Sequence, residues 1–233
     1  MKDLRDRMEP VCRAAARLAP EQGARCIMFM SARDGEGTSS VAASVALLAA
    51  QKSHRPVWLV DLGLRRNDQY RGFQKGFAKK VGKPGRAFDG SLRTLPFYSV
   101  SAEAGVKSNP PKTQRLLAVH QIEGSRLLVT RFRNEALKKG QRVQLRTRPE
   151  WWQQVRRAAS TVIVDAPSLS RSQAGLAMAS QMDGIFIVLQ ADSTGVDEVM
   201  ALRDEIEAHG GVIAGVVMNR IGADARFADR LAG

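Results

Sequence analysis

The chain has few of the residues on which metal and redox chemistry depend. Only two of its 233 residues are cysteines and three are histidines. Cys12 and Cys26 form no C-x-x-C pair and the histidines are scattered, so the sequence shows no zinc or redox site. We interpret the two cysteines as buried or idle thiols in a reducing cytosol.

Long apolar runs are also missing. No window reaches eighteen apolar residues, which argues against a membrane-spanning helix. Residues 1–8 are charged and lack the apolar core of a signal peptide. With 44% hydrophobic residues the chain can still bury a sizeable core. We therefore expect a cytoplasmic protein whose residues 1–233 form a single domain.

Apolar runs alternate with segments of helical pattern. We expect buried strands at residues 25–30, 57–60, 161–164, 184–189 and 212–218, and helices at residues 3–18, 38–52, 150–159 and 195–208. Continuous apolar strands separated by helices predict an α/β fold with a mainly parallel sheet covered on both faces. Ligands of such sheets bind at the carboxyl ends of the strands.

A glycine-rich stretch follows the first expected strand at that edge. It reads Ser31-Ala-Arg-Asp-Gly-Glu-Gly-Thr-Ser-Ser40 and leads into a helix of small residues, which is the context of a phosphate-binding loop. Gly35 and Gly37 let the backbone approach a phosphate, and the first N–H groups of the helix point at the anion. An active loop of this kind places lysine directly after the last glycine. This chain has Thr38 there.

Three further polar residues follow expected strands. Asp61, Asp165 and Asn219 each come at the end of a buried apolar run. Because the carboxyl ends of parallel strands meet at one edge of a sheet, we expect all three to cluster with Gly35.

The positive charge is concentrated in residues 65–150. This segment holds 20 lysines and arginines against 6 acidic residues, a net charge of +14, while the rest of the chain carries −1. Such a block suits acidic lipid, nucleic acid, an anionic polymer or an acidic protein; the alternative is a solvated insertion without an anionic partner. We expect its first half to be rich in loops and its second half to hold two basic strands, 126–133 and 141–146, joined by a turn.

Two tryptophans, Trp151 and Trp152, open the helix that follows the basic segment. Adjacent aromatic residues could form a stacking platform for a ligand. We interpret them instead as core packing beneath the helix.

The glycine-rich stretch and the three strand ends at Asp61, Asp165 and Asn219 form four motifs. In this order they resemble the cytoplasmic tyrosine-kinase domains of bacterial capsule and exopolysaccharide systems, which are related to chromosome-partitioning and division-site ATPases. The resemblance covers residues 1–65 and 155–222 and is weak in between. Residues 35–46 resemble the P-loop and its helix, 57–66 the second motif, 162–167 the Walker B strand and 215–220 the closing strand. It implies a P-loop NTPase-like fold in which residues 66–150 are a basic, family-specific insertion.

The resemblance also implies a site for ATP or ADP with Mg²⁺. The residues it assigns to nucleotide binding are Gly35, Glu36, Gly37, Thr38, Ser39, Ser40, Asp61, Asp165 and Asn219, of which Asn219 contacts the adenine in relatives. Its Mg²⁺ ligands would be Ser39, Asp61 and Asp165. The alternative is that Ser39 is a plain helix cap and that the two aspartates are relics that cap loops.

Three departures from the family pattern bear on activity. Thr38 replaces the clamp lysine, Gly63 stands where a second aspartate is expected, and the tail lacks the cluster of substrate tyrosines, since the only tyrosines are Tyr70 and Tyr98. Electrostatic clamping is nearly all that a protein contributes to phosphoryl transfer. We therefore expect no kinase activity and a nucleotide site that is weak or lost.

These observations favour a degenerate P-loop protein that serves as a regulatory or scaffold component of exopolysaccharide synthesis and export, most similar to proteins of holdfast-polysaccharide synthesis. The implied partner is the cytoplasmic part of an inner-membrane chain-length or export protein, with the basic segment facing the acidic membrane surface and self-association as a further expectation. Two alternatives stay open. One is a slow ATPase in which Arg33 or Lys75 replaces the missing lysine. The other is a partitioning-like protein that binds DNA through residues 65–150.

Overall fold

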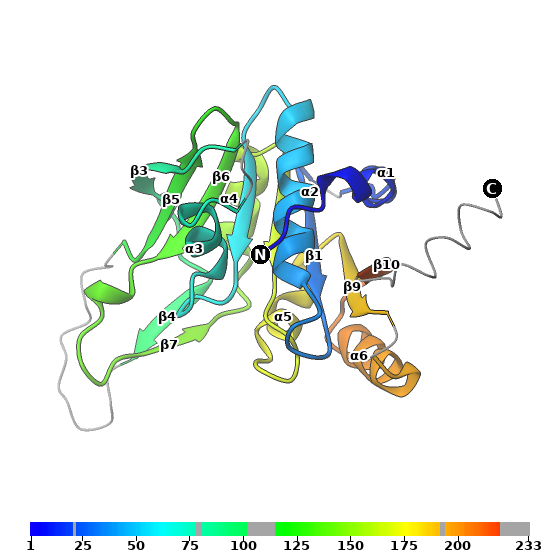
Figure 1. Ribbon diagram of the computed structural model, residues 1–233. Coiled ribbons are helices and arrows are strands. Elements are labelled where there is room, and N and C mark those ends of the chain that lie inside the picture. Colours follow the sequence, from blue (N-terminus) through cyan, green and yellow to red (C-terminus); the bar gives the residue numbers. More distant parts are fainter. Residues whose placement is uncertain (21, 78–80, 102–114, 192–193, 220–233) are drawn as a thin grey trace.

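An eight-stranded sheet forms the centre of the computed structural model, which describes residues 1–20, 22–77, 81–101, 115–191 and 194–219 (Figure 1). Along the sheet the strands are β10 (Ile213–Asn219), β9 (Gly184–Gln190), β1 (Arg25–Met30), β8 (Thr161–Asp165), β2 (Val57–Asp61), β6 (Leu127–Phe132), β5 (Leu117–Ile122) and β3 (Pro84–Asp89). The first six run parallel, whereas β5 and β3 pair antiparallel. The predicted mainly parallel α/β fold is confirmed. The C-terminal tail, in which the sequence lacks a tyrosine cluster, lies outside the described residues.

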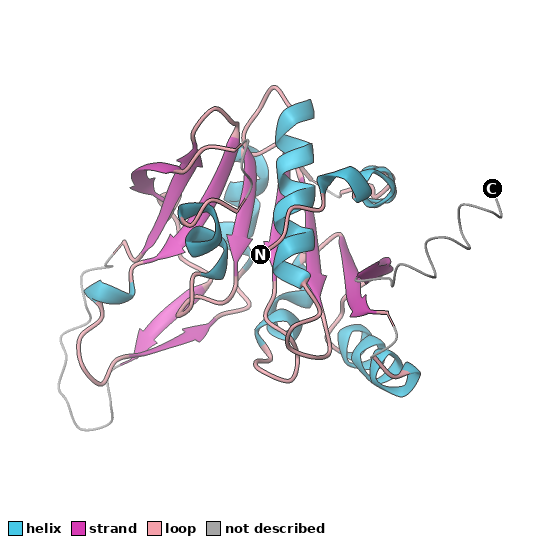
Figure 2. Cartoon of the chain, viewed as in Figure 1, coloured by secondary structure: helices cyan, strands magenta, loops and turns pink. Residues whose placement is uncertain are grey.

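Helices cover both faces of this sheet (Figure 2). One face packs against α1 (Glu9–Ala16), α2 (Thr38–Lys52) and α3 (Asp68–Gln74). The other packs against α4 (Pro149–Ala158), α5 (Ala174–Met178), the 3₁₀ helix η3 (Ala179–Gln181) and α6 (Val196–Ala208). Each face has its own cluster of buried apolar side chains, as expected for strands that are apolar on both sides. Within the described parts of the chain, no helix is long and apolar enough to cross a membrane.

The N-terminal helix differs from the prediction of one helix over residues 3–18. The structure has a 3₁₀ turn, η1 (Arg5–Arg7), and then α1, with Met8 between them. Pro10 explains the break, because proline lacks an N–H group and its ring clashes with the carbonyl four residues earlier, so it fits only the first turn of a new helix. The apolar periodicity was right, since Leu4, Met8 and Ala15 are buried against α2.

The basic segment contains more regular structure than predicted. Its first half carries α3, β3 and β4 (Tyr98–Ser101), and β5 follows. The two predicted basic strands exist as β6 and β7 (Arg142–Leu145), with a short 3₁₀ helix, η2 (Asn134–Ala136), between them, but they do not pair with each other. β6 pairs with β2 and β5 inside the central sheet because Leu127, Val129 and Phe132 are buried, whereas β7 pairs with β4 in a separate two-stranded sheet.

The tryptophan pair is confirmed as core packing. Trp151 and Trp152 are buried, with their rings perpendicular and 5.1 Å apart. Phe97 packs on both of them, and the Trp151 indole donates a hydrogen bond of 2.9 Å to the carbonyl of Gly90. These contacts fasten the loop after β3 to α4.

Candidate functional site

The carboxyl ends of β1, β2, β8 and β10 lie on the same side of the sheet, because these strands run parallel. Asp61 and Asp165 lie directly opposite each other on the neighbouring strands β2 and β8. Asn219, at the end of β10, donates a 2.8 Å hydrogen bond from Nδ2 to the carbonyl of Glu36 in the glycine-rich loop. A cavity of about 800 Å³ opens at this edge between the loop, the ends of β2 and β8, and β7. The structure thus brings the predicted polar residues together.

The glycine-rich loop has the shape that phosphate binding requires. Gly35 and Gly37 have φ angles of 85° and 92°, in the left-handed region that favours glycine. A Cβ atom on Gly37 would lie 2.1 Å from Nδ2 of Asn219, so the two residues are in close contact. Helix α2 begins at Thr38, directly after the loop, and the first N–H groups of a helix have no partner within it. The loop and helix therefore form a backbone cradle for an anion.

Several predicted nucleotide-binding residues turn their side chains to the protein itself. The Glu36 carboxylate is buried and accepts hydrogen bonds from the Arg33 N–H, at 2.9 Å, and from the Thr194 hydroxyl beyond β9. The Ser40 hydroxyl accepts the N–H of Lys2 at 2.9 Å. Asn219, assigned by the resemblance to the adenine, anchors the loop. At these positions the side chain is therefore engaged by the protein itself.

Asp61 holds the loop that follows β2. Its Oδ1 accepts the N–H of Gly63 at 2.8 Å, and its Oδ2 accepts the N–H of Gln69 at 3.0 Å. A Cβ atom at position 63 would lie 2.9 Å from Oδ1 of Asp61. The tight turn therefore explains why glycine stands where the family pattern has a second aspartate.

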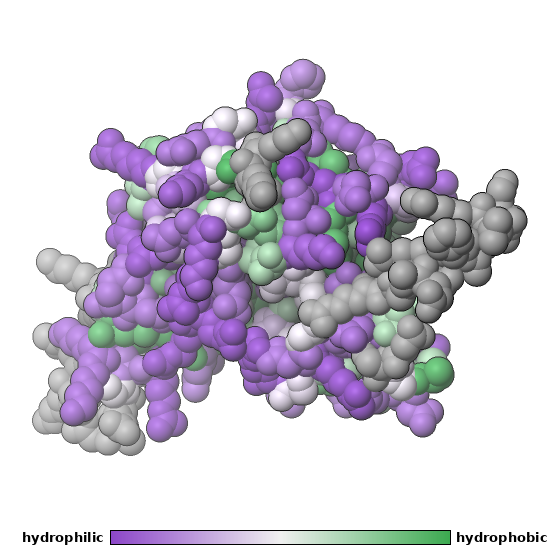
Figure 3. Space-filling view, in the orientation of Figure 1, coloured by the Kyte–Doolittle hydropathy of each residue, from purple (hydrophilic) through white to green (hydrophobic). Residues whose placement is uncertain are grey.

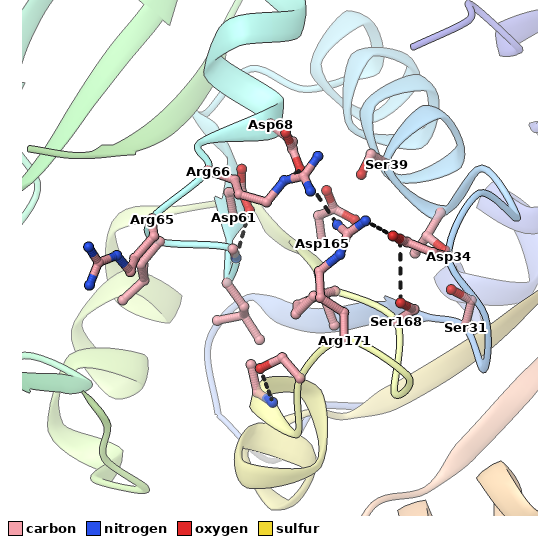
Figure 4. Close-up of a pocket in the computed structure, with 18 of the residues that line it drawn as sticks. Ser31, Asp34, Ser39, Asp61, Arg65, Arg66, Asp68, Asp165, Ser168 and Arg171 are labelled. Carbon is pink, nitrogen blue, oxygen red and sulfur yellow. Dashed lines mark hydrogen bonds and ion pairs between the residues drawn. The ribbon is translucent and has the colours of Figure 1, made fainter. Parts of the chain in front are cut away.

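Asp165 is linked to the phosphate loop through Gln69, which the sequence analysis missed. The fully buried Gln69 amide donates to Oδ2 of Asp165 at 2.7 Å and to the carbonyl of Ser39 at 3.0 Å. No local pattern marks Gln69, because its partners are distant in sequence. Oδ1 of Asp165 is buried and has no hydrogen-bond partner among the described residues. In Figure 4 the Ser39 side chain points toward Asp165.

The two carboxylates have raised pKa values. For each, the main cause is burial, which disfavours the charged form. The charge of Asp61 raises the pKa of Asp165 further, and the polar side chains of Gln69 and Ser39 offset only part of this. Two buried carboxyl groups on neighbouring strands resist ionising together unless a cation or a proton neutralises one of them.

Ser39 and Asp165 fit a Mg²⁺ ion that arrives with a nucleotide. A buried carboxylate oxygen without a partner, facing a hydroxyl at a helix start, matches the few oxygen ligands that a protein supplies to Mg²⁺ beside phosphates and waters. Asp61, the third predicted ligand, already accepts two main-chain N–H groups. Within the described ranges, no group of three or more His, Cys, Asp or Glu side chains is placed to hold a metal by itself.

A row of alternating charges crosses the cavity (Figure 4). Arg171, in the loop after β8, forms an ion pair with Asp34 of the glycine-rich loop and lies 4.0 Å from Oδ2 of Asp68. Arg66 pairs with the same Asp68 oxygen at 2.9 Å. The sequence analysis missed Arg171, because nothing in the sequence relates it to Asp34.

Of the two cations that the sequence suggested as substitutes for lysine, Arg33 lines the cavity but turns its side chain to α6, and Lys75 lies outside the cavity. Arg33 pairs with Glu198 at the start of α6, its Nε lying 2.9 Å from the carboxylate. Lys75, at the end of α3, is not among the residues that line the cavity.

The comparisons with known proteins agree with this geometry. No protein-family model and no curated protein matches the chain. Among solved structures it is similar to the kinase domain of VpsO (16% identity, TM-score 0.60, 94% of each chain covered) and to the BceF tyrosine kinase domain (14%, 0.56, 92% of this chain and 75% of that one). The kinase domain of the Escherichia coli tyrosine kinase ETK is also similar (14%, 0.50, 88% and 72%). The resemblance inferred from the motifs is confirmed for the fold: the chain has the fold of bacterial tyrosine-kinase domains.

Proposed function

We propose that the chain is a kinase-type P-loop domain that does not transfer phosphate and acts as a regulatory or scaffold component of exopolysaccharide synthesis and export. Among such systems, the motifs of the chain resemble most those of proteins that synthesise holdfast polysaccharide. The observation that carries the proposal is the contrast within one site: the backbone cradle keeps its shape while the catalytic side chains are replaced or engaged by the protein.

Two features of the site support the loss of phosphoryl transfer. Thr38 is buried and neutral where the clamp lysine belongs, and Asp61 uses both carboxylate oxygens to hold the loop after β2. Phosphoryl transfer depends on positioned charge around the transferred group, so both changes remove what catalysis needs.

Neither tyrosine is placed as an acceptor of phosphate. Tyr98 is buried, and burial raises its pKa to about 12. The Tyr70 ring packs against His120, with Arg131 5.1 Å from its centroid. We therefore assign both rings a packing role.

The direct test is tyrosine phosphorylation. We expect no phosphotyrosine after the protein is incubated with ATP and Mg²⁺, assayed by mass spectrometry of the Tyr70 and Tyr98 peptides, with an active bacterial tyrosine-kinase domain as the positive control. Phosphate on either tyrosine would overturn the proposal. Binding to the cytoplasmic part of a polysaccharide chain-length or export protein, measured by titration, tests the scaffold role separately.

Weak nucleotide binding is part of the proposal, because the cradle and the Ser39–Asp165 pair remain. Ser39 and Asp165 would hold a Mg²⁺ ion, which would neutralise phosphate charge. The unpartnered Asp165 oxygen also favours a second candidate, a slow ATPase. Phosphate release above background that disappears in Asp165→Asn would support this second candidate.

The basic segment supplies the proposed contact with an acidic membrane surface. Many of its cations are exposed, and hydrophilic side chains cover much of the face seen in Figure 3; the exposed ones include Arg65, Arg71, Arg86, Arg93, Arg126, Lys138, Lys139, Arg142, Arg146 and Arg148. Each basic residue near an anionic leaflet contributes about 1 kcal/mol. Co-sedimentation with vesicles rich in phosphatidylglycerol but not with phosphatidylcholine supports this contact; preferential, salt-sensitive binding to duplex DNA would favour the partitioning-like alternative.

A further inference from the structure

Arg171 brings a cation into the cavity from an element that the phosphate-loop motif does not include. It lies in the loop between β8 and α5, six positions after Asp165. About a third of its side chain is exposed, so the guanidinium faces the cavity and remains open to solvent. In Figure 4 it lies between the glycine-rich loop and the start of α3.

The partner of Arg171 is the informative part of this arrangement. Asp34 belongs to the glycine-rich loop itself and directly precedes Gly35, and more than half of its side chain is exposed. A guanidinium binds a carboxylate and a phosphate in the same way, through parallel N–H donors. The Asp34 carboxylate therefore binds the Arg171 guanidinium in the way that a phosphate group would. It does so at the loop where we expect a phosphate to bind.

Three other arginines line this cavity, Arg33, Arg65 and Arg66, and they are placed differently. Arg33 is turned to Glu198 on α6. Arg66 pairs with Asp68 from the β2–α3 loop and has no ion pair with the glycine-rich loop among the described residues. Arg65 points away from the glycine-rich loop in Figure 4. Of these four arginines, within the described part of the chain, Arg171 is the one whose side chain forms an ion pair with an acidic residue of the glycine-rich loop.

We propose that Arg171 is the phosphate-binding cation that replaces the missing lysine. When the terminal phosphates of a nucleoside di- or triphosphate enter the loop, Arg171 exchanges the Asp34 carboxylate for phosphate oxygens. Asp34 acts as an internal competitor, both by holding Arg171 and by repelling the anion. This inference rests on the retained nucleotide binding of the proposed function and names the residue that supplies its charge.

The test is calorimetric titration of the full chain with Mg²⁺ and ADP across a set of variants. Arg171→Gln should weaken binding about ten-fold, as expected for the loss of a charge-assisted contact, and Arg171→Lys should keep part of the affinity. Asp34→Asn should tighten binding several-fold, and this gain should vanish in the double variant Asp34→Asn/Arg171→Gln. Arg203→Gln on α6 is the control, an arginine outside the cavity that pairs with Asp204, and its removal should leave the affinity unchanged.

Each outcome separates the inference from the proposed function. If Arg171→Gln binds as well as or better than the wild type, while Thr38→Lys tightens binding, the site takes phosphate but Arg171 is not its cation, and the inference falls alone. If the wild type, Asp34→Asn and Thr38→Lys all bind no nucleotide, the inference and the retained nucleotide site both fall. A gain in Asp34→Asn that persists without Arg171 would reduce Asp34 to simple repulsion and would also overturn the inference.

Discussion

The glycine-rich loop and the Asp61–Asp165 pair lie at the same end of one sheet but use their polar groups differently. The loop lines the cavity with its backbone, whereas the two carboxylates bond mainly within the protein. In the loop, Gly35 and Gly37 hold left-handed backbone conformations that place α2 behind an open cradle. In the carboxylate pair, Asp61 accepts two main-chain N–H groups and Asp165 accepts the Gln69 amide. The loop thus leaves its backbone at the cavity, while most of the carboxylate oxygens bond to the protein.

This contrast shows how differently backbone and side-chain functions respond to sequence change. The anion cradle depends on two glycines and a helix start, so it tolerates the loss of the lysine. Catalytic charge depends on particular side chains, and here threonine and glycine replace two of them. The proposed function accordingly keeps nucleotide binding without phosphoryl transfer in the same site.

The largest expected effect concerns the loop geometry. Gly37→Ala should destabilise the protein by roughly 3 kcal/mol, because alanine is strained at positive φ and its Cβ would displace Asn219 from the Glu36 carbonyl. Gly35→Ala is the matched control, with similar φ but no atom within 4 Å of the added Cβ, and should cost about 1 kcal/mol. Equal losses in urea unfolding would show that the Gly37–Asn219 contact contributes nothing.

The sequence predicted the loop better than the carboxylate network, for physical reasons. Strand ends follow from apolar runs, so the positions of Gly35, Asp61, Asp165 and Asn219 at one edge could be inferred. The roles of Gln69 and Arg171 could not, because their contacts join residues far apart in the chain. The strand β3 was missed because the glycines and charges around it favour a loop, whereas its pairing with β5 overrides this local preference. The strands β4 and β5 were missed although their own residues favour strands, because both lie in the segment whose overall composition favours loops.

A second prediction concerns the carboxylate half. Gly63→Asp, which restores the family pattern, should destabilise the protein by about 2 kcal/mol, because it crowds Oδ1 of Asp61 and adds a third carboxylate beside two that already resist ionising. Gly63→Ala separates crowding from charge and should cost about half as much. Thermal unfolding measures both. A stable Gly63→Asp protein that phosphorylates tyrosine would mean that the second motif alone limits catalysis.

The smallest effect is a pH dependence carried by Asp165. Its pKa is raised in the folded state, so the folded protein binds this proton more tightly than the unfolded chain, whose aspartates titrate near about 3.9. Stability therefore falls as the pH rises from that value through the raised pKa. Asp165→Asn removes this loss, and its melting temperature should exceed the wild type's at pH 8 by about 2–4 °C, equivalent to about 1 kcal/mol, with no such gain at pH 4.

The exposed Asp204→Asn on α6 serves as the control and should leave the pH profile unchanged. A gain of the same size at both pH values in Asp165→Asn would mean that the substitution acts through packing rather than through the charge of Asp165.

Binding without phosphoryl transfer is tested most directly in the Thr38→Lys variant, titrated with ATP and Mg²⁺ and then assayed for phosphotyrosine. A lysine at the start of α2 adds a charge-assisted contact to a cradle that is already shaped for phosphate. We predict that ATP affinity increases about ten-fold or more, while no tyrosine is phosphorylated. Unchanged affinity in a folded variant would show that the loop is closed to phosphate, and phosphotyrosine would show that the catalytic side chains are still competent. Either result would contradict binding without phosphoryl transfer.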